Sequence, residues 1–151
     1  ARTWGQPMPS MLTVDGRTYH AFPTPAQLAA RTEDELRDLK LGYRAPYVQR
    51  TAEMVAEAEA DPTAALEHDY EAAREHLTQF VGVGDKVADC VLLFSLGYLE
   101  AVPLCTIPYH YPDCDKGSYT DTSRAIRERL GGAYAGYAQT YLFYYLRTGG
   151  E

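Results

Sequence analysis

The sequence has no long run of apolar residues: hydrophobic side chains make up 46% of its 151 residues, yet no uninterrupted stretch approaches the ~18 that cross a bilayer. We therefore expect no membrane span. Cysteine is also scarce, and Cys90, Cys105 and Cys114 are spaced too widely for a disulfide framework, as is typical of reduced thiols in a cytoplasmic protein. The length suits one core, so we expect a single domain over 1–151.

Lysine is the other scarce residue. Only Lys40, Lys86 and Lys116 occur, and acidic residues outnumber basic ones 21 to 14, which gives a net charge of -7. A negative charge opposes nonspecific binding to DNA. An acidic, lysine-poor surface of a halophilic type is, however, also suited to high salt, where screening shortens charge interactions. The net charge therefore does not exclude a nucleic acid as partner.

Most of the sequence has the periodicity of helices, so the expected fold class is mainly α. Thr24 before Pro25, and Thr32 three residues before Glu35, are typical of capped helix starts. A turn at Asp15-Gly16 allows one small β-hairpin near the N-terminus, within residues 11–22. After a short helix that follows Pro25, helices are expected at about 33–40, 43–60, 70–80, 85–96, 122–130 and 133–147.

Two of these helices are joined by a glycine turn, Val81-Gly82-Val83-Gly84, which predicts a helix-hairpin-helix at about 70–96. Neither glycine carries a Cβ, so the backbone can approach a phosphate, and the amides of the turn and of the next helix can point together at an anion. The alternative is an ordinary corner between two helices, which is the more common meaning of an isolated Gly-x-Gly.

Lys86 lies two residues into the helix that follows this turn, and Cys90 lies one helical turn further on. The helix dipole disfavours a cation there, and burial against Val87 and Leu96 would disfavour it again, which favours a neutral, nucleophilic amine. The alternative is a solvated lysine at the surface, which is the commoner case.

Three segments resemble one known family. The stretch FVGVGDKVADC (80–90) closely resembles the helix-hairpin-helix signature of the 8-oxoguanine DNA glycosylases. LGYRAPYV (41–48) is similar to their segment that enters the DNA at the lesion, and YAGYAQTYLFYYLR (134–147) is similar to their closing helix. The order and spacing agree, and the similarity extends from about Gly16 onward. The resemblance implies an HhH-GPD-type helical fold and a DNA glycosylase and AP lyase that removes oxidised purine in base-excision repair.

The resemblance also implies roles for residues of the hairpin. Lys86 would attack the sugar C1′, expel the base and form a Schiff base whose collapse nicks the strand, and Cys90 would pair with it. Gly82, Gly84 and the amide of Val87 would hold backbone phosphates. The implied partner is damaged double-stranded DNA, bound by a monomer in a prokaryotic cytoplasm at the nucleoid, with neither cofactor nor metal.

Four further residues receive roles in the same way. Tyr43 would wedge beside the gap left by the extruded base, and Arg44 would contact the cytosine left behind. Gln139 would hydrogen-bond the pairing edge of the extruded base, while Phe143 would stack on it. These roles fit an enzyme that must extrude its base and read it by edge and face. From the residues alone, helix packing is the preferred explanation for Gln139 and Phe143.

The sequence departs from the family at two places. In AVPLCTIPYHYPDCDKGSY (101–119), Cys105 occupies the position of an aspartate that stabilises the developing charge on the sugar. A thiol accepts hydrogen bonds poorly, so we expect base excision to be impaired more than cleavage at abasic sites. The family's first domain has no counterpart here, and we expect the chain to match the later part of a longer pattern.

Other functions remain open. A noncatalytic helix-hairpin-helix module would bind DNA through the same turn, and a protein-interaction fragment would bind none. Cys105, His110 and Cys114, with Asp113 nearby, have residue types that suit zinc, but three strong ligands are too few to predict a site. Five of the thirteen tyrosines lie between residues 134 and 145, where we expect them to pack a core helix or a subunit contact.

Overall fold

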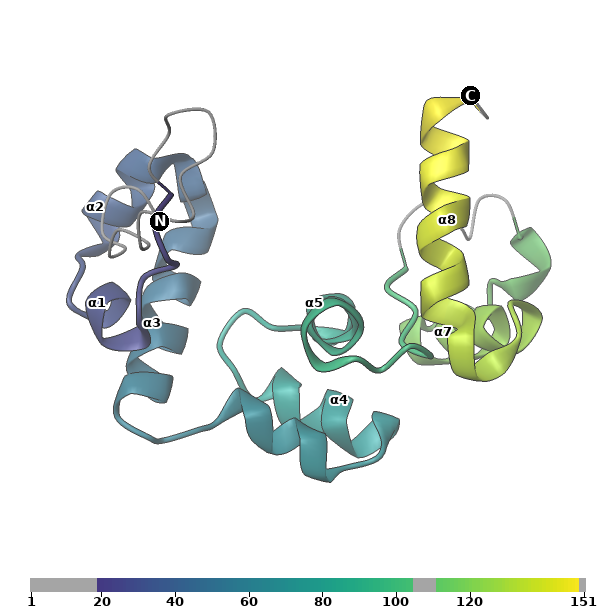
Figure 1. The fold of residues 1–151 in the computed structure, drawn as a ribbon, viewed down its shortest axis with the longest axis horizontal. Helices are drawn as coiled ribbons and strands as arrows, with labels where there is room; N and C mark the ends of the chain where they lie inside the picture. The colour runs from purple at the N-terminus through teal and green to yellow at the C-terminus, as the bar shows by residue number, and fades with distance from the viewer. Residues whose placement is uncertain (1–18, 105–110, 150–151) are drawn as a thin grey trace. The chain divides into compact units, whose positions relative to one another are not determined.

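The computed structural model describes residues 19–104 and 111–149. Contacts within the chain divide it into two compact units, Ala1–Asp61 and Pro62–Glu151. Each unit is helical, and none of the described residues forms a strand, so the expected α class is confirmed (Figure 1). The expected β-hairpin lies mostly outside the described residues. The prediction of one domain over 1–151 stays a prediction.

The first unit contains α1 (Pro25–Ala29), α2 (Glu33–Leu36), a π-helical turn (Arg37–Leu41), a 3₁₀ turn (Gly42–Arg44) and α3 (Ala45–Ala56). Both predicted N-caps are present, and each forms a capping box, although the sequence predicted a box only at Thr32: Thr24 accepts from the Gln27 amide at 3.3 Å, and Thr32 accepts from the Glu35 amide at 3.2 Å. α1 packs along α3.

Two helical segments of this unit end at residues in the left-handed conformation. Lys40 has a φ of 63° and breaks the second helical segment where the sequence predicts its end, whereas α3 ends earlier than the predicted residue 60, with Ala58 at a φ of 57° beyond it. Both values lie in the left-handed region, which an L-residue seldom adopts and which ends a right-handed helix.

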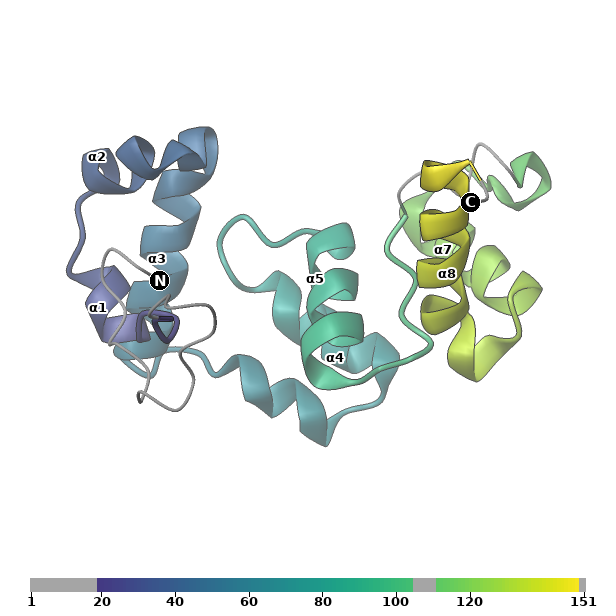
Figure 2. The same cartoon turned by 45° about the horizontal axis from the view of Figure 1, so that its top comes forward.

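The second unit carries the predicted helix-hairpin-helix. Its two helices are α4 (Tyr70–Thr78) and α5 (Asp85–Val91), and α5 continues as a π-helical segment (Leu92–Leu96) that ends at Gly97. α4 and α5 are in contact, and they lie side by side in Figures 1 and 2. Around them the unit contains η4 (Pro62–Glu67), η6 (Pro112–Cys114), α7 (Tyr119–Arg129), η7 (Gly132–Tyr134) and α8 (Ala135–Thr148).

α8 docks through its first turn. The amides of Gly136 and Tyr137 donate to the carbonyl of Leu99 at 2.8 and 3.2 Å. A Cβ at Gly136 would lie 1.9 Å from the carbonyl oxygen of Ala101, so only glycine allows this approach. The docking fixes which face of α8 is buried.

The tyrosines between residues 134 and 145 are not packed in the core, so that part of the expectation is wrong, while the alternative of a subunit contact stays a prediction. The residues that α8 buries are small or polar: Ala135, Gly136 and Gln139. The five tyrosines expose between 51% and 65% of their surface, and they are Tyr134, Tyr137, Tyr141, Tyr144 and Tyr145. None of the described helices has the length and apolar character that crossing a bilayer requires.

Candidate functional site

The glycine turn between α4 and α5 leaves its backbone open. Val83 donates its amide to the carbonyl of Phe80 at 3.0 Å, which closes the turn. Gly82 has a φ of 80°, a conformation that glycine adopts without strain. Gly84 is the N-cap of α5, with a φ of -96°, and a Cβ built there would meet no atom within 4 Å. Both glycines are exposed, so a phosphate can reach the main chain here.

The amide of Val87 already has a partner in this structure. It donates to the carbonyl of Gly84 at 2.9 Å, as does the amide of Ala88. Both bonds belong to the first turn of α5. A phosphate at this amide would therefore share it with Gly84, and the role of Val87 stays a prediction.

Lys86 is exposed in the first turn of α5, and Val87 beside it is 45% exposed. The expected burial of this lysine is therefore wrong. The buried residues of α5 are Ala88 and Asp89, so Lys86 and Val87 lie outside the buried face. Cys90 is half-buried one turn after the lysine. An exposed amine beside an open hairpin is accessible to a macromolecular substrate.

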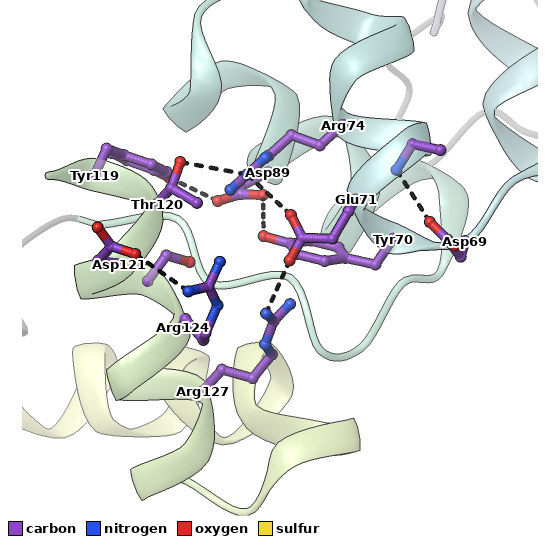
Figure 3. A network of polar contacts seen from close by, with 12 residues as sticks. Asp69, Tyr70, Glu71, Arg74, Asp89, Tyr119, Thr120, Asp121, Arg124 and Arg127 are labelled. Atoms are coloured by element: carbon purple, nitrogen blue, oxygen red, sulfur yellow. Dashed lines mark hydrogen bonds and ion pairs between the residues drawn. The ribbon is translucent and has the colours of Figure 1, made fainter.

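α5 also carries a buried carboxylate, and Figure 3 shows its partners. Asp89 is completely buried. It accepts a hydrogen bond from the Tyr70 hydroxyl on α4 at 2.8 Å and one from the Tyr119 hydroxyl on α7 at 2.7 Å. Burial raises the pKa of Asp89, and the bonds from Tyr119 and Tyr70 oppose the rise. Burial and the neighbouring carboxylate raise the pKa of both tyrosines far above the ordinary value.

Two arginines lie near Tyr70, on the side of this cluster that faces Glu71. Arg74 is almost buried, and it pairs with Glu71 at 3.0 Å. Arg127 pairs with the same Glu71 at 3.1 Å, and its guanidinium lies 4.5 Å from the centre of the Tyr70 ring. Figure 3 shows these side chains converging from α4 and α7. The sequence analysis did not predict this cluster. Asp89 is a polar residue on the same helical face as Ala88 and Leu92, and that position could have indicated it.

Gln139 and Phe143 share a face of α8, one turn apart. Gln139 is 5% exposed, and its Nε2 donates to the carbonyl of Pro103. Its Oε1 is buried and has no hydrogen-bond partner among the described residues. Phe143 is half-buried, with the Arg147 guanidinium 5.9 Å from its ring centre. The two side chains therefore place a buried hydrogen-bond acceptor and an aromatic ring on one face of α8.

Tyr43 and Arg44 belong to the first unit. Both are exposed in the 3₁₀ turn that leads into α3, and the Arg44 guanidinium lies 4.5 Å from the centre of the Tyr43 ring. Tyr47 meets Tyr43 edge-on, with 6.5 Å between the ring centres. The stack holds an aromatic ring and a cation together at the surface.

The cysteine-rich segment is only partly within the described residues. Cys105 and His110 lie outside them, while Cys114 is buried. Within 19–104 and 111–149, no group of three or more His, Cys, Asp or Glu side chains could hold a metal.

Comparison with known proteins gives sequence relatives of one kind, although no family model matches. The probable N-glycosylase/DNA lyase of Methanothermobacter thermautotrophicus is 34% identical over 99% of this chain and 53% of that protein. The N-glycosylase/DNA lyase of Saccharomyces cerevisiae is 44% identical over 61% of the chain and 27% of that protein. The N-glycosylase/DNA lyase OGG1 of Arabidopsis thaliana is 32% identical over 86% and 40%. The chain thus spans about half the length of the first of these relatives and less of the others.

Comparison with solved structures gives matches of the same kind. The Clostridium acetobutylicum 8-oxoguanine glycosylase/lyase, in complex with double-stranded DNA containing cytosine opposite 8-oxoguanine, matches with a TM-score of 0.83 and 30% identity over 99% of this chain and 51% of that one. The chain is a homologue of the 8-oxoguanine glycosylase/lyases. The structure of MBOgg1 in complex with a low-affinity DNA ligand also matches, with a TM-score of 0.84 and 30% identity over 100% of this chain and 52% of that one. The resemblance carried by the three sequence segments is confirmed.

Proposed function

We propose that this chain is a DNA glycosylase and AP lyase that acts on oxidised purine in duplex DNA, with Lys86 as its nucleophile. The observation that carries the proposal is the exposed amine of Lys86, in the first turn of α5 directly after an open glycine hairpin. That arrangement occurs in a chain related over nearly its whole length to proteins named as N-glycosylase/DNA lyases and 8-oxoguanine glycosylase/lyases.

The chemistry uses the lone pair of the amine. The lone pair of Lys86 Nζ attacks C1′, the bond between C1′ and the base nitrogen breaks, and the base leaves with that electron pair and takes up the proton that Nζ releases. The C1′–O4′ bond then breaks, O4′ takes up a proton from water, and the opened sugar forms a Schiff base between Nζ and C1′. Loss of a proton from C2′ then expels the 3′ phosphate and nicks the strand. The half-buried Cys90, four residues along α5, is the thiol proposed to pair with Lys86.

The base pocket is proposed at Gln139 and Phe143. The pairing edge of a guanine-type base carries N–H donors, and Gln139 Oε1 is a buried acceptor without a partner among the described residues. Phe143 is half-buried one turn later and offers a face for stacking. Edge and face recognition together suit an extruded purine.

DNA is proposed to be held at two places. Gly82 and Gly84 present the open hairpin to a backbone phosphate, and Tyr43 and Arg44 act at the gap left by the base. The exposed stack of Arg44 on Tyr43 supports this, because one side chain can fill the gap while the other reaches the unpaired cytosine.

A borohydride-trapping experiment tests the proposal. The chain should form a covalent adduct with a duplex that contains an abasic site, and Lys86→Gln should abolish the adduct. Lys116→Gln is the matched control, since Lys116 is exposed in the same unit and donates its Nζ to the Asp113 carbonyl at 2.7 Å. Trapping that survives Lys86→Gln would refute the assignment. Duplex binding without any adduct would support the noncatalytic module instead.

Cys105 separates the two activities. A Schiff base with a free aldehyde needs only the amine, whereas excision of an intact base develops positive charge on the sugar. Losing a preorganised stabilising group typically costs about 100-fold or more in rate. Cleavage at abasic sites should therefore exceed 8-oxoguanine excision, and Cys105→Asp should raise excision in a single-turnover assay. Equal excision by both forms would show that residue 105 does not act on the sugar.

A further inference from the structure

We infer that Asp89 is a positioning residue: its buried carboxylate fixes α5 between α4 and α7 and thereby holds Lys86 in the orientation that its reaction needs. The inference rests on the proposed function of Lys86. It concerns a residue that does not touch the DNA, and it is carried by burial and by two hydrogen bonds.

Asp89 uses each of its carboxylate oxygens for a different neighbouring helix. Oδ1 accepts from Tyr70 of α4 at 2.8 Å, and Oδ2 accepts from Tyr119 of α7 at 2.7 Å. Both distances are typical of hydrogen bonds that a hydroxyl group donates to an oxygen acceptor. One side chain of α5 therefore fastens the helix on two sides, as the dashed lines in Figure 3 show.

Few apolar contacts determine the orientation of α5 at the end that carries Lys86. Gly84 gives this end no side-chain cap, and Ala88 is the only other buried residue of α5, because the larger buried side chains, Leu92 and Leu93, lie in the π-helical segment that follows. Even with that segment the helix is marginal alone, because isolated helices need roughly 12–15 residues. A methyl group packs without directional preference, whereas two hydrogen bonds at opposite oxygens define how the helix is turned about its axis. Lys86, three residues before Asp89, turns with it.

The network also reaches the backbone beside Cys105. The Tyr119 hydroxyl that donates to Asp89 accepts a hydrogen bond from the amide of Leu104 at 3.3 Å. Leu104 directly precedes the residue that occupies the position of the family's aspartate. Asp89 and Tyr119 thus link the helix that carries the nucleophile to the chain next to residue 105.

Burial of a carboxylate is costly, and a well-packed apolar side chain would often serve stability equally well. A buried carboxyl group that makes two directional bonds is therefore better explained by orientation than by stability. Misplacing a reacting group by about 1 Å can cost on the order of 100-fold in rate, so a loosened α5 should be visible in the kinetics.

The test compares Asp89→Asn with Ile126→Val. The asparagine keeps the shape but leaves one tyrosine hydroxyl without an oxygen acceptor. Ile126 is a completely buried residue of the same unit that packs in an apolar cluster with Val102, Cys114 and Ala135, so its truncation tests destabilisation without removing a hydrogen bond of the Asp89 network. Tyr119→Phe, which removes one of the two bonds, is the second variant in case Asp89→Asn does not fold.

The readout is the single-turnover rate of adduct formation on an abasic duplex, with the dissociation constant and the melting temperature measured beside it. Asp89→Asn should slow the reaction on the order of 10- to 100-fold, while duplex affinity changes by less than about twofold. Tyr119→Phe should slow it about three- to tenfold, and Ile126→Val should leave the rate unchanged. Because Asp89 does not exchange a proton with Lys86, the pH at half-maximal rate should not move.

A rate for Asp89→Asn equal to that of the unaltered chain would overturn the inference. So would an equal loss in Ile126→Val at a matched melting temperature, because the effect would then be one of stability. Hydrogen exchange of the α5 amides distinguishes a failure of the inference about Asp89 from a failure of the proposed function. If the unaltered chain forms no adduct, Lys86 is not the nucleophile. Faster exchange in α5 alone would then still support positioning by Asp89, and unchanged exchange would overturn it.

Discussion

Tyr70 and Tyr119 should make the stability of the fold sensitive to alkali. Burial and the Asp89 charge raise the pKa of both phenols far above the ordinary value of about 10. Above that pH the unfolded chain releases two protons that the folded chain retains, so the free energy of unfolding falls as the pH rises. Each buried phenol should contribute about 1.4 kcal/mol per pH unit. Urea unfolding between pH 9 and about 11 should show a flatter decline for Tyr119→Phe, and an equal decline would contradict this.

Gln139 can be tested by separating base recognition from helix packing. Gln139→Ala removes the buried Oε1 acceptor, and an unmade hydrogen bond to the base should cost about 1–3 kcal/mol, or roughly 10- to 100-fold in excision. Trapping at an abasic site, where no base is read, should stay nearly unchanged. Thr140→Ala is the control, because Thr140 is exposed and donates within α8 to the Gly136 carbonyl at 3.1 Å. If both activities fall equally, Gln139 is a packing residue.

The identity of the site residues was predictable from local sequence, but their surroundings were not. The segment that contains Lys86 indicated the nucleophile through resemblance, because a hairpin signature is contiguous in sequence. Which face of α5 is buried depends on α4 and α7, and the sequence of α5 alone led to the wrong expectation of a buried lysine. The same reason explains Asp89, whose two partners lie 19 and 30 residues away in the chain.

Among the elements, the docking of α8 depends on one glycine. Gly136→Ala places a Cβ 1.9 Å from the Ala101 carbonyl oxygen, so α8 has to move and its two amide bonds to Leu99 weaken. We expect a loss of about 1–3 kcal/mol in the free energy of unfolding, measured with urea. Gly84→Ala is the matched control, because no atom lies within 4 Å of its Cβ and its φ is -96°. Equal stability of the two variants would contradict the close approach.

Gly84→Ala also tests the hairpin. The substitution fits the backbone of α5, so it should leave stability unchanged while the added methyl keeps a phosphate away from the amides. Duplex affinity should fall about tenfold, equivalent to roughly 1.4 kcal/mol, as measured by fluorescence anisotropy. Gly82→Ala is less informative, because its φ of 80° adds backbone strain. Unchanged affinity would make the turn an ordinary corner.

The helices themselves were predictable where their signals are local. Capping at Thr24 and Thr32 involves residues three apart, and both starts are confirmed. The start of α7 was expected near residue 122 but lies at Tyr119, because the Ser118 hydroxyl accepts from the Asp121 amide at 3.1 Å. The exposed tyrosines of α8 were not predictable from periodicity, since the docking of Gly136 against the distant Ala101 decides which face is buried.

At the scale of the whole molecule, part of the positive charge is already paired within the chain. The sequence has 14 lysines and arginines against 21 acidic residues. Among the described residues, six arginines form ion pairs with carboxylates of the chain itself: Arg31, Arg37, Arg50, Arg74, Arg124 and Arg127. An ion-paired arginine has to release its carboxylate partner before it can bind a phosphate. Main-chain amides, which carry no net charge, should therefore supply much of the backbone contact.

This distribution predicts a shallow dependence of DNA binding on salt. Each cation that neutralises a phosphate contributes about -0.9 to the slope of log affinity against log salt, so two or three such contacts give about -2 to -3. Arg44→Ala should leave that slope unchanged and reduce the preference for cytosine over adenine opposite the lesion, because the proposed contact is to a base. Arg50 is an arginine of α3 that pairs with Glu53 and Glu59. Arg50→Ala should change neither the salt slope nor the preference for cytosine. Fluorescence anisotropy across a range of KCl concentrations measures both. A slope that becomes shallower by about one unit, with equal losses for every duplex, would instead assign Arg44 to a phosphate.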